Sequence, residues 1–181
     1  MKVTNLLSVL ATAASASALS INLMSGLNDQ SPMISPATVP TIPGGSPITY
    51  CVEANYNPKN DLVDIERISI DPNPPVVGKS LHLEVSGDVK QRIEEGAVLA
   101  VEVKLGVIRL IKKDFDFCDL LSQANVTVSC PIEPGHLEVI KDQDLPAQIP
   151  PGKFVVSAHL YTTGKKELVT CLHTEITFGR K

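Results

Sequence analysis

Cysteine is the residue type in this sequence whose number and spacing could indicate a metal site or a set of disulfides. The four cysteines are Cys51, Cys118, Cys130 and Cys171. Their spacing argues against zinc, because the sequence has no C-x2–4-C motif and no closely spaced histidine pair. Disulfides that join the first cysteine to the last and the inner two to each other, Cys51–Cys171 and Cys118–Cys130, are the simplest arrangement. Four cysteines allow three pairings, so the residues alone leave the connectivity open.

Histidines and acidic pairs are the other candidates for chemistry. The histidines are isolated from one another in sequence, at His82, His136, His159 and His173. The acidic pairs Glu94-Glu95 and Asp114/Asp116 fall in predicted turns, where solvated side chains are expected. No GxSxG, HExxH, GxGxxG or P-loop motif is present in the sequence. We therefore expect no catalytic residue, no cofactor, no bound metal and no enzyme activity.

The composition bounds the class of protein. The chain has 181 residues and a formal charge of −4, with acids and bases interspersed, so nucleic-acid binding is not expected. Hydrophobic residues make up 43% of the chain, but aromatic residues only 4%, and tryptophan is absent. The core must therefore be aliphatic, which favours strands. The 14 prolines indicate many turns between those strands.

The N-terminal sequence predicts that the chain enters the secretory pathway. Lys2 precedes a short apolar run over residues 3–14, and Ala16-Ser17-Ala18 fits a cleavage site, so residues 1–18 read as a secretory signal peptide. No other apolar run approaches ~18 residues. We expect a soluble protein of the secretory pathway, in a vacuole lumen or outside the cell, where disulfides form. On that route Asn125, in the one N-x-S/T sequon, is expected to be exposed and glycosylated.

Residues 19–49 form a separate stretch that contains five prolines, the Gly44-Gly45 pair and a single charge. No strand or helix period is sustained there, and the composition cannot bury enough surface to offset chain entropy. We interpret it as a disordered leader or a propeptide, with a permanently attached tail as an equal alternative. The folded domain is expected over residues 50–178.

The stretch between the outer cysteines alternates apolar and polar residues and is broken by proline and glycine. Seven strands are predicted at 61–70, 80–89, 97–105, 107–112, 136–145, 153–161 and 167–178. The first has an imperfect alternation that suggests a bulge or a late start of the strand. Residues 113–130 are irregular, and no helix is expected. The pattern predicts an all-β, immunoglobulin-like sandwich of seven strands.

Several ordered motifs carry a family resemblance. They are Asp71-Pro72-Asn73-Pro74-Pro75, Glu94-Glu95-Gly96-Ala97, Cys130-Pro131-Ile132, Ile149-Pro150-Pro151-Gly152-Lys153 and Thr170-Cys171-Leu172. With the cysteine positions, they make residues 50–178 resemble the ML, or lipid-recognition, domain family. The resemblance includes the soluble Niemann–Pick type C sterol carriers and, more closely, the fungal phosphatidylglycerol/phosphatidylinositol transfer proteins. It implies a sandwich whose sheets are splayed around a lipid, and it supports the two disulfides proposed above.

The resemblance also implies a binding site between the sheets. Alternation places six apolar side chains on the inner faces, Leu83, Val85, Val101, Val103, Phe154 and Val156, although a shift of one residue would reverse them. The positions that match the family's entrance are Ile111, Ala147, Ile149 and Pro150, with Phe115 nearby. Three lysines flank this region, Lys112, Lys113 and Lys153. They are predicted to contact an anionic headgroup or a membrane surface, with a solvated basic fringe as the alternative.

The function predicted from the sequence is therefore non-enzymatic lipid binding and transfer between membranes. The ligand is phosphatidylglycerol or phosphatidylinositol, or else a sterol, and an aliphatic interior suits each of them. Transient contact with a membrane surface follows, and a membrane sterol transporter is a further candidate partner of what is expected to be a monomer. The alternative is an immunoglobulin-like recognition or adhesion module with a filled core.

Overall fold

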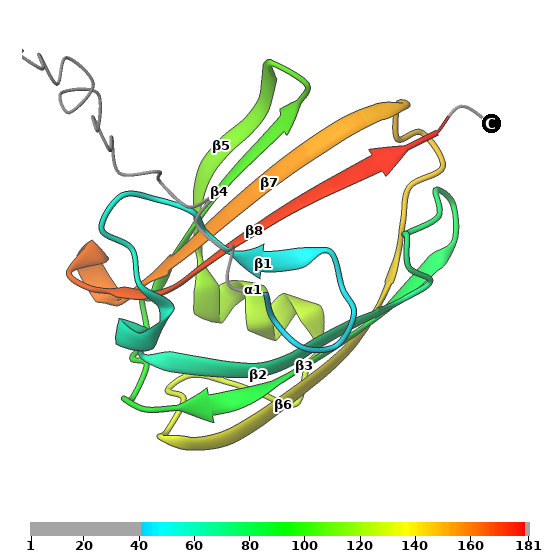
Figure 1. Ribbon diagram of the computed structural model, residues 1–181. Coiled ribbons are helices and arrows are strands. Elements are labelled where there is room, and N and C mark those ends of the chain that lie inside the picture. The colour runs from blue at the N-terminus through cyan, green and yellow to red at the C-terminus, as the bar shows by residue number, and fades with distance from the viewer. Residues whose placement is uncertain (1–40, 180–181) are drawn as a thin grey trace, which may run out of the picture. The chain divides into compact units, whose positions relative to one another are not determined.

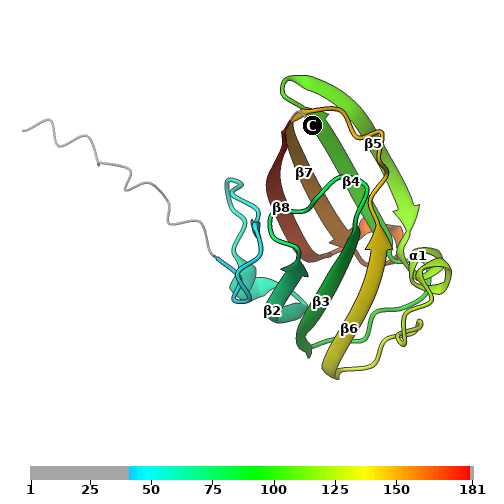
Figure 2. The ribbon, with the colours of Figure 1, turned by 90° about the vertical axis from the view of Figure 1, so that its right-hand side faces the viewer.

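The computed structural model describes residues 41–179. These residues form two antiparallel sheets that face each other (Figures 1 and 2). The five-stranded sheet has the order β1 (Ile48–Tyr50), β8 (Leu168–Phe178), β7 (Gly152–Tyr161), β4 (Val98–Leu105) and β5 (Ile108–Asp116). The three-stranded sheet has the order β2 (Val63–Asp71), β3 (Ser80–Val89) and β6 (Gly135–Asp144). The predicted all-β sandwich is confirmed, while the predicted signal peptide lies outside the described residues.

All seven predicted strands are present, and the described part of the chain contains an eighth, β1. β1 has only three residues and owes its strand conformation to pairing with β8, which no local pattern could show. The bulge expected in the first predicted strand is confirmed in β2, where the register with β3 shifts between Ile65 and Arg67. Gly106 forms the turn between β4 and β5, with a φ of 57° that glycine adopts without strain.

A helix occurs where none was expected. α1 spans Phe117–Ala124 and follows β5 directly. The side chain of Asp116 accepts a hydrogen bond from the Asp119 N–H at 3.0 Å and caps the first turn. Asn125, in the left-handed conformation with a φ of 51°, ends the helix. These two caps are the local signals that predict α1. Two short 3-10 helices, η1 (Pro58–Asn60) and η2 (Thr163–Lys165), occupy loops.

α1 lies beside the edge strands β5 and β6 (Figure 2). Lys141 of β6 donates a 2.6 Å hydrogen bond from Nζ to the main-chain oxygen of Ala124 at the C-terminal end of the helix. The helix therefore bridges the two sheets at this side. No helix within residues 41–179 has the length and apolar character that a membrane span requires.

Residues 41–47 fall within the predicted leader, yet in the structure they pack beside β1 and β2. Thr41 forms an isolated bridge with Thr49. Ile42 is only 5% exposed. The Pro43 main-chain oxygen accepts a 2.8 Å hydrogen bond from the Ile68 N–H. The packed domain therefore includes residues upstream of the expected start at residue 50.

Two clusters of buried apolar residues hold the sheets together. The first comprises Leu62, Val89, Ile93, Ala97, Ile132, Leu160 and Val169. Phe117 and Leu121 of α1 pack against it, so this cluster lies at the α1 end of the sandwich. The second comprises Ile42, Tyr50, Ile65 and Ile68, along the β1 and β2 side. Each Val, Leu or Ile side chain among them stabilises the fold by about 1.5–3 kcal/mol when it is fully buried.

Both predicted disulfides are confirmed. Cys51–Cys171 joins the residue after β1 to β8, across 120 positions of the chain. Cys118–Cys130 joins α1 to the segment before β6, across 12 positions. In the loop-entropy account they stabilise the fold by about 4–5 and about 3 kcal/mol, respectively.

Candidate functional site

The inner face of the five-stranded sheet is apolar along its centre. Residues that pair directly across antiparallel strands point to the same face. Leu99 of β4 pairs with Leu160 of β7, and Leu160 belongs to the first buried cluster, so this row faces inward. The next inward pairs along β4 and β7 are Val101–Ala158, Val103–Val156 and Leu105–Phe154. An aliphatic surface with one aromatic ring therefore lines this wall.

The side chains of this wall are only partly buried. β4 lies between β5 and β7, yet none of its eight residues is fully buried. Val101, Val103, Phe154 and Val156 are partly exposed and lie outside both buried clusters. In a filled sandwich, central inward side chains interdigitate with those of the facing sheet and lose contact with solvent. These inward side chains therefore keep solvent contact that the central side chains of a filled sandwich lack.

The facing wall comes from β3 and its neighbours. Leu83 and Val85 point inward, because they pair with the buried residues Ile70 and Ile68 of β2. Both are partly buried and pack against the second cluster. Val139 of β6 continues this wall as the partner of Val85. All six side chains predicted to line the interior thus lie on the inner faces of the two sheets.

The residues predicted at the entrance occupy one end of the sandwich, with one exception. Ile111, 45% exposed, lies on the inner side of β5, opposite Val103. Ala147, Ile149 and Pro150 lie in the loop between β6 and β7. This loop leads into the start of β7, which contacts the β4–β5 turn through a 2.8 Å hydrogen bond from the Gly106 N–H to the Lys153 oxygen. Phe115 is the exception, because it lies opposite Leu99 at the far end of β5.

Phe115 lies near the other end of β5, next to α1. It is four residues from Ile111, or ~13 Å along an extended strand. Its partner in β4 is Leu99, so its ring faces inward. A groove of about 360 Å³ runs between this part of β5 and α1, and its lining includes Lys113, Phe115 and Leu120. Phe115 therefore belongs to the α1 side of the interior rather than to the loop end.

The three predicted headgroup lysines do not gather at one point. Lys113 is on the inner side of β5, with its Nζ 5.0 Å from the centre of the Phe115 ring. Lys112 is on the outer side, where it pairs with Glu102 of β4. Lys153 is also outside and forms a 2.7 Å ion pair with Glu175, which lowers the pKa of that carboxyl. Lys113 alone among the three faces the interior.

Sequence reasoning missed the most exposed apolar surface, the tip of the β4–β5 hairpin. Val107 is 98% exposed, Ile108 62% and Leu110 49%. Residues 104–113 include four cations and no acid, a signal that was readable in the sequence. Two of these cations, Lys104 and Arg109, contact Oε1 of Glu102 at 3.2 and 2.9 Å and lower the pKa of its carboxyl.

The outer face of the five-stranded sheet carries a second hollow. A groove of about 620 Å³ lies over β1, β7 and β8, and its lining includes Thr49, Cys51, Glu53 and His173. His173 Nδ1 lies 3.2 Å from Ser157 Oγ, and the two residues are cross-strand partners. This groove is separated from the apolar interior by the sheet itself.

Comparison with known proteins places the fold in a family. The sequence model of the ML domain family matches residues 45–178, and the chain belongs to this family, as predicted. The phosphatidylglycerol/phosphatidylinositol transfer protein of Neurospora crassa is 44% identical over 140 residues, which cover 77% of each chain. That of Yarrowia lipolytica is 47% identical over 137 residues, 76% of this chain and 69% of the other. Among solved structures, chicken MD-1 complexed with lipid IVa aligns with a TM-score of 0.49 and 17% identity, over 77% of this chain and 97% of that one.

Proposed function

We propose that this protein binds a lipid between its two sheets and transfers it between membranes. The observation that carries this proposal is the partly exposed apolar face of β4, which leaves room for an acyl chain or a sterol where a filled sandwich has none. Family membership and the names of the similar fungal proteins support it. Phosphatidylglycerol and phosphatidylinositol are the proposed ligands, with a sterol as the second candidate.

Burial of hydrocarbon suffices to hold such a ligand. Each methylene removed from water contributes about 0.8 kcal/mol, so a dozen of them contribute roughly 10 kcal/mol before the cost of ordering. Capture and release by this mechanism need no covalent step, which is why we propose a carrier rather than an enzyme. Val101, Val103, Phe154 and Val156 form one wall of the proposed site, and Leu83 and Val85 form the other.

The loop end of the sandwich is the proposed entrance. Ile111, Ala147, Ile149 and Pro150 would border it, and the exposed hairpin tip would touch a bilayer during exchange. Lys112 and Lys153 lie on the outer face and are proposed to contact anionic lipids of that bilayer. Lys113 faces inward and is proposed to meet the phosphate of a bound phospholipid, with Phe115 beside it.

The route and partners follow from the same proposal. We propose that the chain travels the secretory pathway to a vacuole lumen or the cell exterior, a route that suits its two disulfides. Asn125 is exposed at the end of α1, as glycosylation requires. The protein is proposed to act as a monomer and to deliver its ligand to membranes or to a membrane sterol transporter.

Lipid analysis of the native protein tests the function. We expect mass spectrometry of the purified chain to detect about one phospholipid or sterol per protein. We also expect the protein to move labelled phosphatidylinositol between vesicles. A protein that carries no lipid and accelerates no transfer of phosphatidylglycerol, phosphatidylinositol or sterol would contradict the proposal.

A further inference from the structure

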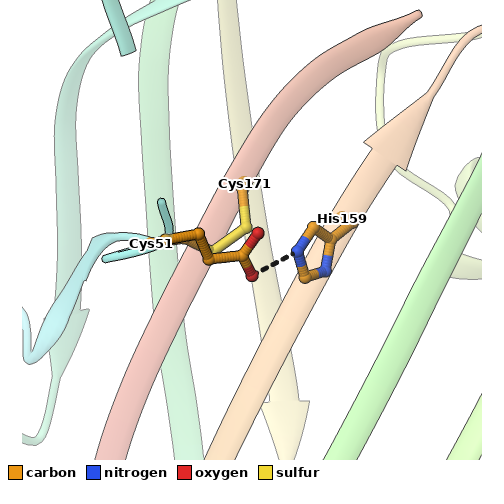
Figure 3. A group of neighbouring side chains, drawn as sticks. Cys51, His159 and Cys171 are labelled. Atoms are coloured by element: carbon orange, nitrogen blue, oxygen red, sulfur yellow. Dashed lines mark hydrogen bonds and ion pairs between the residues drawn. A yellow bond between two sulfur atoms is a disulfide. The ribbon is translucent and has the colours of Figure 1, made fainter. Parts of the chain in front are cut away.

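Four side chains with metal-binding atoms meet on the outer face of the five-stranded sheet, at the edge of the outer groove. They are Cys51, Glu53, His159 and Cys171, and one sulfur, nitrogen or oxygen atom from each lies within 4.8 Å of all the others. Figure 3 shows the disulfide and His159 side by side. No zinc motif is visible in the sequence because Glu53 and His159 are 106 positions apart and come together only through the fold.

The fold delivers these donors in two pairs. His159 of β7 and Cys171 of β8 are direct cross-strand partners on the outer face. Cys51 follows β1, and its N–H donates a 3.1 Å hydrogen bond to the Cys171 oxygen. Glu53 comes two residues later, and its Oε1 lies 2.8 Å from His159 Nε2. Two donors therefore come from a rigid sheet and two from the loop laid over it.

We propose that this cluster is a redox-gated zinc site. With the disulfide formed, Cys51 and Cys171 bind each other and the site is closed to metal. With the disulfide reduced, two thiolates, the His159 Nε2 atom and the Glu53 carboxylate bind one Zn²⁺. Thiolate, imidazole and carboxylate are the ligands of tetrahedral zinc, with Zn–S near 2.3 Å and Zn–N near 2.0 Å. Small movements bring donors already within 4.8 Å of one another to these positions.

Conversion of the disulfide form into the zinc-bound form needs two electrons, which a dithiol reductant can supply. The reductant gives two electrons and two protons to the Cys51–Cys171 bond, which breaks into two thiols, and the reductant becomes a disulfide. Zinc then displaces one proton from each thiol as the two Zn–S bonds form, so metal binding releases two protons. The disulfide form of the same reductant reverses both steps: it takes back the two electrons and two protons, the Cys51–Cys171 bond forms again and the Zn²⁺ ion is released.

The surroundings suit a metal held between sheet and solvent. Cys171 is 0% exposed and Cys51 5%, so the sulfur side is dry. The side chains of His159 and Glu53 are 22% and 52% exposed, and Glu53 lines the groove of about 620 Å³, through which an ion can approach. The His159 ring stacks on Tyr161 with centroids 6.1 Å apart, which restricts its rotation. Within residues 41–179, the Cys118–Cys130 disulfide belongs to no such donor cluster and serves as an internal control.

The test measures zinc on the full chain before and after reduction with a dithiol. After removal of free metal, we expect the reduced wild-type protein and a Cys118→Ser/Cys130→Ser variant to hold one zinc per chain. We expect none on the oxidised protein or on a reduced Cys51→Ser/Cys171→Ser variant. Cobalt in place of zinc should give the thiolate charge-transfer and tetrahedral absorption bands. His159→Gln and Glu53→Gln should each weaken zinc affinity by about tenfold or more.

Each other outcome decides against the site. Equal zinc on the oxidised protein or on the Cys51→Ser/Cys171→Ser variant places the metal elsewhere. Affinity unchanged in both His159→Gln and Glu53→Gln leaves a simple dithiol chelate and overturns the four-ligand site. If reduction unfolds the chain, circular dichroism decides: recovery of the sheet signal on adding zinc supports the proposal, and no recovery overturns it.

Discussion

The Tyr56 hydroxyl donates a 2.6 Å hydrogen bond to Oδ2 of Asp61, a residue that is only 3% exposed. Burial raises the pKa of the Asp61 carboxyl above its usual range, and the hydrogen bond from Tyr56 opposes that rise. The same hydroxyl accepts a 3.3 Å hydrogen bond from the Cys171 N–H. The pair thus ties the loop after β1 to β8, beside the Cys51–Cys171 disulfide.

Replacement of Tyr56 by Phe should make stability more sensitive to pH. Because the folded-state pKa of Asp61 is raised, its contribution to stability is fully present below the unfolded pKa and is lost as pH rises through the folded pKa. Without the Tyr56 donor, the ionised carboxylate is left poorly satisfied, and we expect a loss of ~1–3 kcal/mol near neutral pH. The loss should be smaller at acid pH, because the raised folded-state pKa favours the protonated carboxyl there. Urea unfolding at neutral and at acid pH measures the difference.

Asp61→Asn is the matched control for that experiment. The introduced amide has no charge to desolvate, so the stability of the Asp61→Asn variant should not fall over the pH range in which the wild-type carboxyl ionises. Tyr56→Phe made in this background should lose its extra pH dependence. Parallel pH profiles for the wild type and both single variants would contradict the role assigned to Asp61.

A charged side chain on the inner wall should distinguish a lipid carrier from an adhesion module with a filled core. Val103→Asp places a carboxylate on the apolar inner wall, and we expect uptake of labelled phosphatidylinositol to fall by about tenfold or more because a bound acyl chain would desolvate that charge. The fold should survive, since Val103 already reaches solvent. Val155→Asp makes the same change on the outer face of β7 and should leave uptake unchanged. Unfolding of Val103→Asp at room temperature would instead favour the adhesion module with a filled core.

The hairpin tip should govern contact with membranes but not lipid binding in solution. Val107→Asp/Ile108→Asp replaces two exposed apolar side chains, and we expect binding to vesicles that contain phosphatidylglycerol to drop about tenfold or more. Wild-type binding should also weaken as salt rises, because the cations of residues 104–113 are screened. Val52→Asp, 60% exposed elsewhere, is the control. Vesicle sedimentation is the assay, and equal binding by both variants would rule out the tip as the contact.

The sequence could predict the features that depend on the local residue pattern, but not those that depend on how distant strands pair and pack. Alternation in β4 placed Val101 and Val103 on the inner face because a strand has a period of two. The cluster of His159 with Cys171 follows from the register of β7 against β8, which alternation alone does not fix. The partial exposure of these inward side chains likewise depends on how the two sheets pack against each other, which alternation does not fix; the lipid-filled interior was predicted only from the family resemblance.

Gly44 shows why the segment before β1 belongs to the folded domain, and its substitution should reveal this. A Cβ atom there would lie 2.1 Å from the main-chain oxygen of Ile68, and its φ is 117°. Gly45 also has a positive φ, 74°, but a Cβ would meet nothing within 4 Å. We expect Gly45→Ala to cost about 1 kcal/mol of unfolding free energy from backbone strain alone. Gly44→Ala should cost at least about 3 kcal/mol, because the segment must also move off β2. Urea unfolding of both variants measures the difference, and equal costs would mean that residues 41–47 do not pack against β2 in solution.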